Sequence, residues 1–246
     1  MKASRLRTLW IVILSLLFTA NTCGRAAVKH LFGPVSRQWC DEQLQRWVKQ
    51  MIKLLGIQCQ VFNPYNVEPK KGQATIVMVN HSSLFDIPLS LMAFPNHSLR
   101  MLAKKELSQI PIFGQGMKAA EFPLIDRKNK SQAFKDLQTV HKLLESGIVM
   151  WIAPEGTRSK DGKVAPFKKG AFITAIQAGA TIIPIGIRGA FDILPAGTYQ
   201  FNINQRAEIH IGKPIDASQF TLDERDQLIA QTRQAIKHLV ESPQPE

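Results

Sequence analysis

Residues 74–86 read ATIVMVNHSSLFD, and they combine a buried strand with the start of a helix. The first seven residues are mostly apolar and rich in β-branched side chains, as in a strand that is covered on both faces. A short polar segment follows, and residues 84–94 then have the composition of a buried helix. A strand followed directly by a helix is typical of an α/β protein with parallel strands.

The same alternation continues along the chain. Further strands are expected at residues 99–103, 121–125, 147–153, 181–187 and 207–211, and further helices at 131–145, at 169–178 and after the capping box Thr221-x-x-Glu224. The sequence therefore predicts an α/β domain over residues 64–241, with a largely parallel central sheet flanked by helices. Residues 242–246 are expected to form a flexible tail.

Residues 1–63 are expected to form an N-terminal, membrane-anchoring helical hairpin. The uncharged segment from Thr8 to Gly24 corresponds to roughly 25 Å of helix, close to the hydrocarbon thickness of about 30 Å. It either spans the bilayer or dips into it; a cleaved signal peptide is less favoured, because bulky Phe18 lies three residues before a cut after Ala20. A second helix at 41–55 is amphipathic, which suits either the membrane interface or packing on the domain.

The composition restricts the partners. The apolar fraction of 45% suits a globular core, and the net charge of +12 points to an anionic partner. No nucleic-acid-binding motif is present, and the basic residues do not interleave with aromatic residues, so no nucleic acid is expected. The three cysteines, at 23, 40 and 59, lack the spacing of a metal or redox motif, and no metal site is predicted.

His81 is the first candidate catalytic residue, because it follows the strand at 74–80. Ligands of open α/β sheets collect beyond the carboxyl ends of the strands. Asp86, expected about one turn into the next helix, could orient the imidazole and stabilise the imidazolium formed when His81 accepts a proton. A histidine that only caps the helix remains an equal alternative on this pattern alone. Ser82 and Ser83 lie outside a Gly-x-Ser-x-Gly motif, which disfavours a serine nucleophile.

Basic residues follow other predicted strands. After the strand at 147–153, Gly156 permits a tight turn and Arg158 offers a planar set of donors that suits a phosphate. Lys104 and Arg127 follow two further strand candidates. Together with His81, these side chains would converge on one edge of the sheet. A base beside several cations describes a site that deprotonates an alcohol of a phosphorylated molecule.

Four blocks of the sequence, in order, resemble the 1-acylglycerol-3-phosphate acyltransferases and the wider glycerolipid acyltransferase family. They are Asn80-His81-x4-Asp86 and the segments 122–127, 154–159 and 182–186, and the segment 103–107 is similar to the family's lysine segment. Two departures are visible. Ala153 stands where the family usually has an aromatic residue. Residues 121–124 lack the glycine and the aromatic residue that the second block often carries.

The resemblance implies a role for each matching residue. His81 would be the general base and Asp86 its partner. The substrate-binding residues would be Lys104, Arg127 and Arg158 on the phosphate of the acceptor, with Glu155, Gly156 and Thr157 in the loop that contacts it.

The implied reaction transfers a fatty acyl group from acyl-carrier protein (acyl-ACP) or acyl-CoA to the sn-2 hydroxyl of lysophosphatidic acid. The product would be phosphatidic acid, an intermediate of phospholipid biosynthesis. Glycerol-3-phosphate or another lysophospholipid remains an alternative acceptor. No cofactor or covalent intermediate is implied. We expect the protein at the cytoplasmic (inner) membrane, in contact with membrane phospholipid, with its catalytic domain on the cytoplasmic side.

Overall fold

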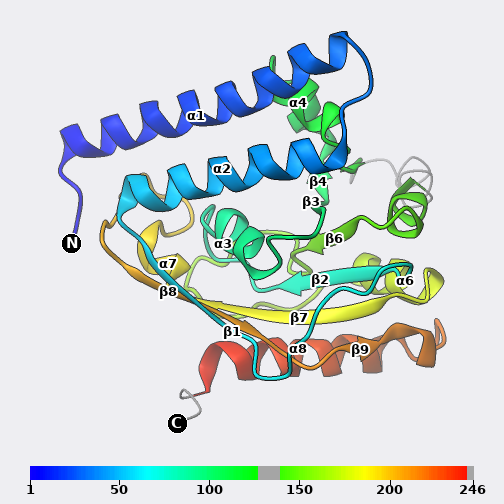
Figure 1. The fold of residues 1–246 in the computed structure, drawn as a ribbon. Coiled ribbons are helices and arrows are strands. Elements are labelled where there is room, and N and C mark those ends of the chain that lie inside the picture. Colours follow the sequence, from blue (N-terminus) through cyan, green and yellow to red (C-terminus); the bar gives the residue numbers. More distant parts are fainter. Residues whose placement is uncertain (127–138, 243–246) are drawn as a thin grey trace.

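The computed structural model describes residues 1–126 and 139–242. Arg127, most of the helix expected at 131–145 and most of the expected tail lie outside these residues. The centre of the molecule is a seven-stranded sheet in the order β1-β8-β7-β2-β6-β3, with β9 pairing with β7 (Figure 1). Its strands are β1 (Gln58–Phe62), β2 (Thr75–Val79), β3 (Leu99–Met101), β6 (Val149–Ile152), β7 (Thr181–Arg188), β8 (Arg206–Ile211) and β9 (Ile215–Asp216). Four of the strand pairings in this sheet are parallel, and only the pairings of β7 with β8 and with β9 are antiparallel, so the predicted, largely parallel α/β sheet is confirmed.

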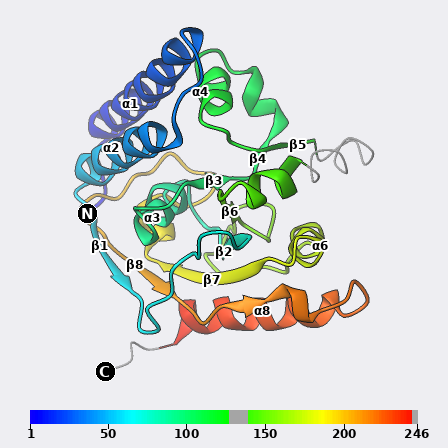
Figure 2. The ribbon, with the colours of Figure 1, turned by 45° about the vertical axis from the view of Figure 1, so that its right-hand side comes forward.

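Helices cover both faces of this sheet. They are α1 (Arg5–Leu31), α2 (Arg37–Leu55), α3 (Asp86–Ala93), α4 (Phe113–Ala119), α6 (Gly170–Gln177), α7 (Ala190–Ile193) and α8 (Arg225–Glu241), with 3-10 turns at Lys105–Gln109 and Ala217–Gln219. Helices α2 and α3 lie over one face with α1 outside them, and α8 lies against the other (Figures 1 and 2). Strand β2 shows why both faces are covered. Val77 and Val79 enter the core on the α2–α3 side, whereas Ile76 and Met78 enter the core that α6 and α8 share.

Two parts of the sheet architecture differ from the prediction. Strand β1 pairs in parallel with β8, although residues 1–63 were assigned to the N-terminal region. It is an edge strand with half-exposed side chains, so it lacks the continuous apolar run of a central strand. The strand expected at 121–125 does not join the main sheet. Its residues Leu124–Ile125 (β5) pair with Ala103–Lys104 (β4) in a separate two-stranded sheet.

Helix α1 lies along the domain and is attached to it near both ends. Before the helix, the Ala3 N–H donates to the carbonyl of Phe201 at 2.9 Å. Towards the other end, α1 packs so closely on α4 that a Cβ at Gly116 would lie 2.5 Å from the Cα of Cys23. Between the two helices of the hairpin, the Trp47 indole N–H donates to the Thr19 hydroxyl at 3.0 Å.

The two helices of the hairpin use their apolar side chains differently. The stripe of α2, with Val48, Met51 and Leu55, is buried in the domain core, which decides between the two roles considered for this helix. Helix α1 instead exposes a stripe at helical spacing, formed by Leu6, Leu9, Trp10, Ile13, Leu16 and Leu17. Within the described residues, α1 is the one helix whose length and hydropathy would allow it to cross a membrane.

Candidate active site

The site forms where β2 and β6 end side by side. The strands are parallel and pair Met78 with Ile152, so the segments that follow them leave the sheet at the same edge. Asn80 joins this edge to β7. Its buried side-chain amide donates to the carbonyl of Ile187 at 2.9 Å and accepts the Ile187 N–H at 2.7 Å. The sequence did not predict this role for Asn80, which holds the start of the next segment firmly in place.

His81 and Asp86 are in direct contact, as the sequence predicted. The His81 Nδ1 lies 2.8 Å from Asp86 Oδ2, and the same oxygen accepts the N–H groups of Ser82 and Ser83 at 2.7 and 2.8 Å. Asp86 is the first residue of α3 rather than a residue one turn into it, so the positive end of the helix dipole adds to its stabilisation. An ionised carboxylate only accepts hydrogen bonds, so Nδ1 carries the proton and Nε2 is left with a lone pair.

The side chain of Ser83, two residues after His81, has a structural role. The Ser83 hydroxyl donates to the carbonyl of Leu194 at 2.9 Å, and the side chain is fully buried. Ser83 also accepts the Phe85 N–H at 3.2 Å, which closes the turn that leads into α3. These contacts agree with a histidine-centred site rather than a serine nucleophile.

Glu155 and Ser159 hold the main chain of His81 from both sides. The Glu155 carboxylate accepts the His81 N–H at 2.8 Å and the Ala165 N–H at 3.1 Å, while the Ser159 N–H donates to the His81 carbonyl at 2.7 Å. Glu155 is only 2% exposed; burial raises the pKa of its carboxyl, and the bonds from the two N–H groups oppose that rise. Glu155 therefore links the main chain of His81 to that of Ala165. The resemblance implied in addition that Glu155 contacts the acceptor.

The residues between these two contacts remain accessible. Gly156 has a φ of 75°, a conformation that glycine adopts without strain, which agrees with the predicted tight turn. Thr157 is exposed and Arg158 is half-buried, and both lie between the residues that hold His81. The structure therefore gathers His81, Asp86 and the 155–158 turn at one place.

Lys104 lies on the small sheet, which follows a segment bonded to Trp151. It is exposed at the end of β4, two residues after Leu102, whose N–H donates to the carbonyl of Trp151 at 3.0 Å. The Trp151 ring meets the His81 ring edge-on, with 5.8 Å between their centroids. No role was predicted for Trp151, although an aromatic residue three positions before Pro154 could have indicated one. Arg127, the remaining predicted phosphate ligand, lies outside the described residues.

An apolar cavity of about 430 Å³ lies between helices α1 to α4. Leu84 and Phe85, from the turn between His81 and Asp86, form part of its wall. Further lining comes from Met51 and Trp47 of α2 and from Phe122 before β5. The cavity therefore begins at the turn between His81 and Asp86 and extends under the N-terminal helices.

Comparison with known proteins agrees with this geometry. A family model described as Acyltransferase matches residues 58–188, more than half of the chain. A 1-acyl-sn-glycerol-3-phosphate acyltransferase of Haemophilus influenzae is 29% identical over 180 residues, which cover 72% of this chain and 72% of the relative. A chloroplastic 1-acyl-sn-glycerol-3-phosphate acyltransferase of Arabidopsis thaliana is 29% identical over 193 residues, which cover 76% of this chain.

The match covers only part of some relatives, and it extends to the fold. The chain spans about half the length of the plant relatives, 52% for the Arabidopsis protein and 49% for a chloroplastic relative from Brassica napus. The crystal structure of the 1-acyl-sn-glycerophosphate acyltransferase of Thermotoga maritima superposes with a TM-score of 0.80 at 25% identity, covering 98% of this chain and 97% of that one. The sequence blocks, the site geometry and these matches agree, and the chain belongs to the acyltransferase family.

Proposed function

We propose that this protein transfers a fatty acyl group from acyl-ACP or acyl-CoA to the sn-2 hydroxyl of 1-acyl-sn-glycerol-3-phosphate, which gives phosphatidic acid. The observation that carries the proposal is the contact between His81 Nδ1 and Asp86 Oδ2, 2.8 Å long, beside the 155–158 turn. The names of the relatives from Haemophilus influenzae and Arabidopsis thaliana support lysophosphatidic acid as the acceptor.

In the proposed reaction, His81 acts as the general base. Its Nε2 accepts the proton of the acceptor hydroxyl while the oxygen attacks the thioester carbonyl. The new C–O bond forms, the C–S bond breaks, and the departing thiolate takes the proton back from the imidazolium. Asp86 stabilises the imidazolium between these steps, because it is a buried anion in contact with the ring. These reaction steps require neither a metal ion nor an acyl-enzyme intermediate.

The acceptor phosphate is assigned to the cations around the 155–158 turn. Arg158 supplies a planar set of N–H donors, and Thr157 adds an exposed hydroxyl. Lys104 and Arg127 complete the set in the proposal. The negative phosphate would thereby be held while the neutral hydroxyl faces His81.

The apolar cavity is assigned to an acyl chain of the substrates. Its wall contains Leu84 and Phe85, which adjoin the catalytic pair, so a chain bound there would begin near the reacting carbonyl or glycerol. Binding an acyl chain in an apolar cavity removes it from water, which is favourable at about 0.8 kcal/mol per CH₂ group.

We further propose that α1 lies in one leaflet rather than spanning the bilayer. Its contacts with the domain near both ends leave its exposed apolar stripe as the surface that would enter the lipid. Residues 1–40 contain no acidic residue, and both ends of α1 carry cations: Lys2, Arg5 and Arg7 at one end, Arg25 and Lys29 at the other. A helix lying flat would place both groups against the same headgroups, which suits the anionic cytoplasmic leaflet.

Acyl transfer with purified protein in mixed micelles tests the proposal. Lysophosphatidic acid, glycerol-3-phosphate and other lysophospholipids would each be offered with acyl-ACP and with acyl-CoA. We expect preferred turnover of lysophosphatidic acid, and a loss of at least about two orders of magnitude in His81→Ala. His141→Ala, at a half-exposed histidine paired with Glu145, is the matched control. Equal or better turnover of glycerol-3-phosphate would contradict the assigned acceptor, and near-normal activity of His81→Ala would contradict the mechanism.

A further inference from the structure

Glu121 has a main-chain conformation that only a specific contact explains. Its φ is 59°, in the left-handed region that glycine enters freely and other residues enter at a cost. Glu121 also belongs to the segment 121–124, which lacks the glycine that the family's second block often carries early. A strained glutamate persists only where its surroundings hold it.

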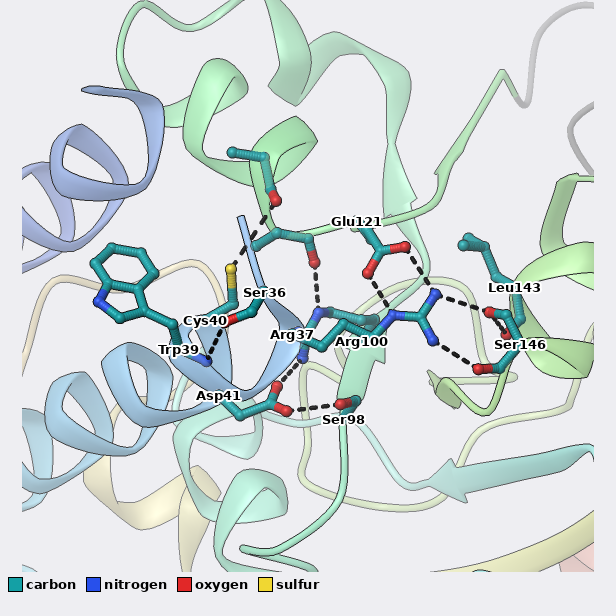
Figure 3. Close-up of polar contacts among 12 residues, drawn as sticks. Ser36, Arg37, Trp39, Cys40, Asp41, Ser98, Arg100, Glu121, Leu143 and Ser146 are labelled. Atoms are coloured by element: carbon teal, nitrogen blue, oxygen red, sulfur yellow. Dashed lines mark hydrogen bonds and ion pairs between the residues drawn. The ribbon is translucent and has the colours of Figure 1, made fainter. Parts of the chain in front are cut away.

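Arg37, in the first turn of α2, holds the Glu121 carboxylate with two hydrogen bonds. Its Nε and Nη2 donate to Oε2 at 2.5 Å and to Oε1 at 2.8 Å (Figure 3). The same guanidinium donates to the carbonyl and the hydroxyl of Ser146 at 2.6 and 2.9 Å. Two parallel bonds between a guanidinium and a carboxylate define an orientation as well as an attraction. The Arg37 guanidinium also lowers the pKa of Glu121, which keeps the carboxylate charged.

A second contact lies one turn further along α2. Asp41 accepts Arg100 Nη1 at 2.7 Å and the Ser98 hydroxyl at 2.6 Å (Figure 3). The fully buried Arg100 also donates from Nε to the carbonyl of Ala120, directly before Glu121. The first two turns of α2 thus hold one chain segment through Arg100 and another through Glu121.

These two segments lead into the small sheet that carries Lys104. Arg100 lies three residues before β4, and Glu121 lies three residues before β5. The strands pair Lys104 with Ile125, and the Ala103 N–H donates to the carbonyl of Pro123 at 2.9 Å. A shift of either segment would therefore move Lys104.

We propose that Glu121, held by Arg37, is a positioning residue that fixes the β4–β5 pair against α2 and thereby places Lys104 for binding of the acceptor phosphate. This inference rests on the proposed function, because it assigns the acceptor phosphate to Lys104. The inference also links the binding of α1 to the membrane with the binding of the substrate. Helix α2 packs on α1, whose exposed stripe is assigned to the lipid. The helix that holds Arg100 and Glu121 therefore also supports the helix that enters the leaflet.

Steady-state kinetics of two substitutions at one position test this role. Glu121→Gln keeps the strained backbone and weakens the contact, whereas Glu121→Gly removes the contact and relieves the strain. We expect KM for lysophosphatidic acid to rise about two- to fivefold in both variants, the upper part of the range for a half-exposed ion pair, with kcat within about twofold. The exchange Arg37→Glu with Glu121→Arg should recover most of the affinity. Glu241→Gln, which breaks an exposed pair with Lys237, is the matched control.

Hydrogen exchange measured on the same variants separates this inference from the proposed function. Faster exchange at residues 102–105 and 122–126 is expected in both Glu121 variants and not in the control. An unchanged KM in Glu121→Gly would overturn the inference, as would a parallel loss of kcat and melting temperature, because the contact would then serve the fold alone. If the wild type does not acylate lysophosphatidic acid, the proposed function fails. The exchange data then decide whether Glu121 fixes the β4–β5 pair, and unchanged exchange would refute it.

Discussion

Replacing Asp86 by asparagine tests how the carboxylate supports His81. The substitution preserves the size and shape of a fully buried side chain and removes its charge. In the wild type, Oδ2 accepts the His81 ring and two main-chain N–H groups at 2.7–2.8 Å. An asparagine carbonyl can take over this position, but its NH₂ group must then occupy the place of Oδ1, which has no hydrogen-bond partner among the described residues.

The expected loss of activity has two physical causes. The neutral amide no longer stabilises the imidazolium, and a hydrogen bond to a charged group contributes about 1.5–3 kcal/mol. If the amide rotates, its NH₂ group faces Nδ1 and selects the tautomer whose Nε2 carries a proton, so the base is blocked. The corresponding change in the serine-protease triad lowers kcat about 10⁴-fold. We expect kcat of Asp86→Asn to fall about 10³-fold, which corresponds to about 4 kcal/mol in the activation free energy.

The assay measures the rate of single-turnover acyl transfer to lysophosphatidic acid. KM for the acceptor and the melting temperature are measured on the same variants. KM should change little, because Asp86 is fully buried and touches the histidine rather than the solvent. Asp223→Asn, at an exposed position, is the control. A loss of less than about tenfold in Asp86→Asn, in a protein that melts like the wild type, would refute the proposed role.

Three further substitutions test the surroundings of the site. Glu155→Ala leaves two main-chain N–H groups without their acceptor, so chemical denaturation should show that the free energy of unfolding falls by about 1–3 kcal/mol for each group. The change in kcat should be larger than the change in KM. Leu9→Glu with Leu16→Glu places charges on the exposed stripe of α1, and liposome flotation should show lost membrane binding with an unchanged melting curve. Gly116→Ala drives a methyl group against Cys23, so the melting temperature should fall by an amount equivalent to about 1–3 kcal/mol of overpacking, and an unchanged value would contradict the close packing of α1 on α4.

The central strands were predictable because the physics of a covered parallel strand leaves a simple pattern. Strands β2, β6 and β7 are buried on both faces, so their sequences are predominantly apolar, although β7 includes Pro184 and Gly186. The small strands β4 and β5 have two residues each, too few to produce a period. Their pairing depends on the contacts of Arg100 and Glu121 with α2, which no local pattern encodes.

The candidate site was predictable where side chains meet side chains over a short spacing. His81 and Asp86 are five residues apart across one turn, and their residue types already suggest a base and its partner. Glu155 and Ser159 act on the main chain of His81, and such contacts depend on how two loops approach each other in space. The role of Asn80, directly before the histidine, could not be predicted for the same reason, because its partner Ile187 lies 107 residues away.

The N-terminal hairpin shows why an apolar sequence alone does not define how a helix is placed. Burial of an apolar stripe is non-directional, so the stripe of α1 favours lipid without fixing the angle or register of the helix against the domain. Hydrogen bonds are directional, and polar contacts occur at separate points of the hairpin: Ala3 before α1, Trp47 between the helices, and Arg37 and Asp41 at the start of α2. Contacts at both ends and in the middle oppose rotation as well as translation. If α1 enters a leaflet as proposed, these contacts keep the geometry of the site below it, which a helix attached by apolar packing alone would not ensure.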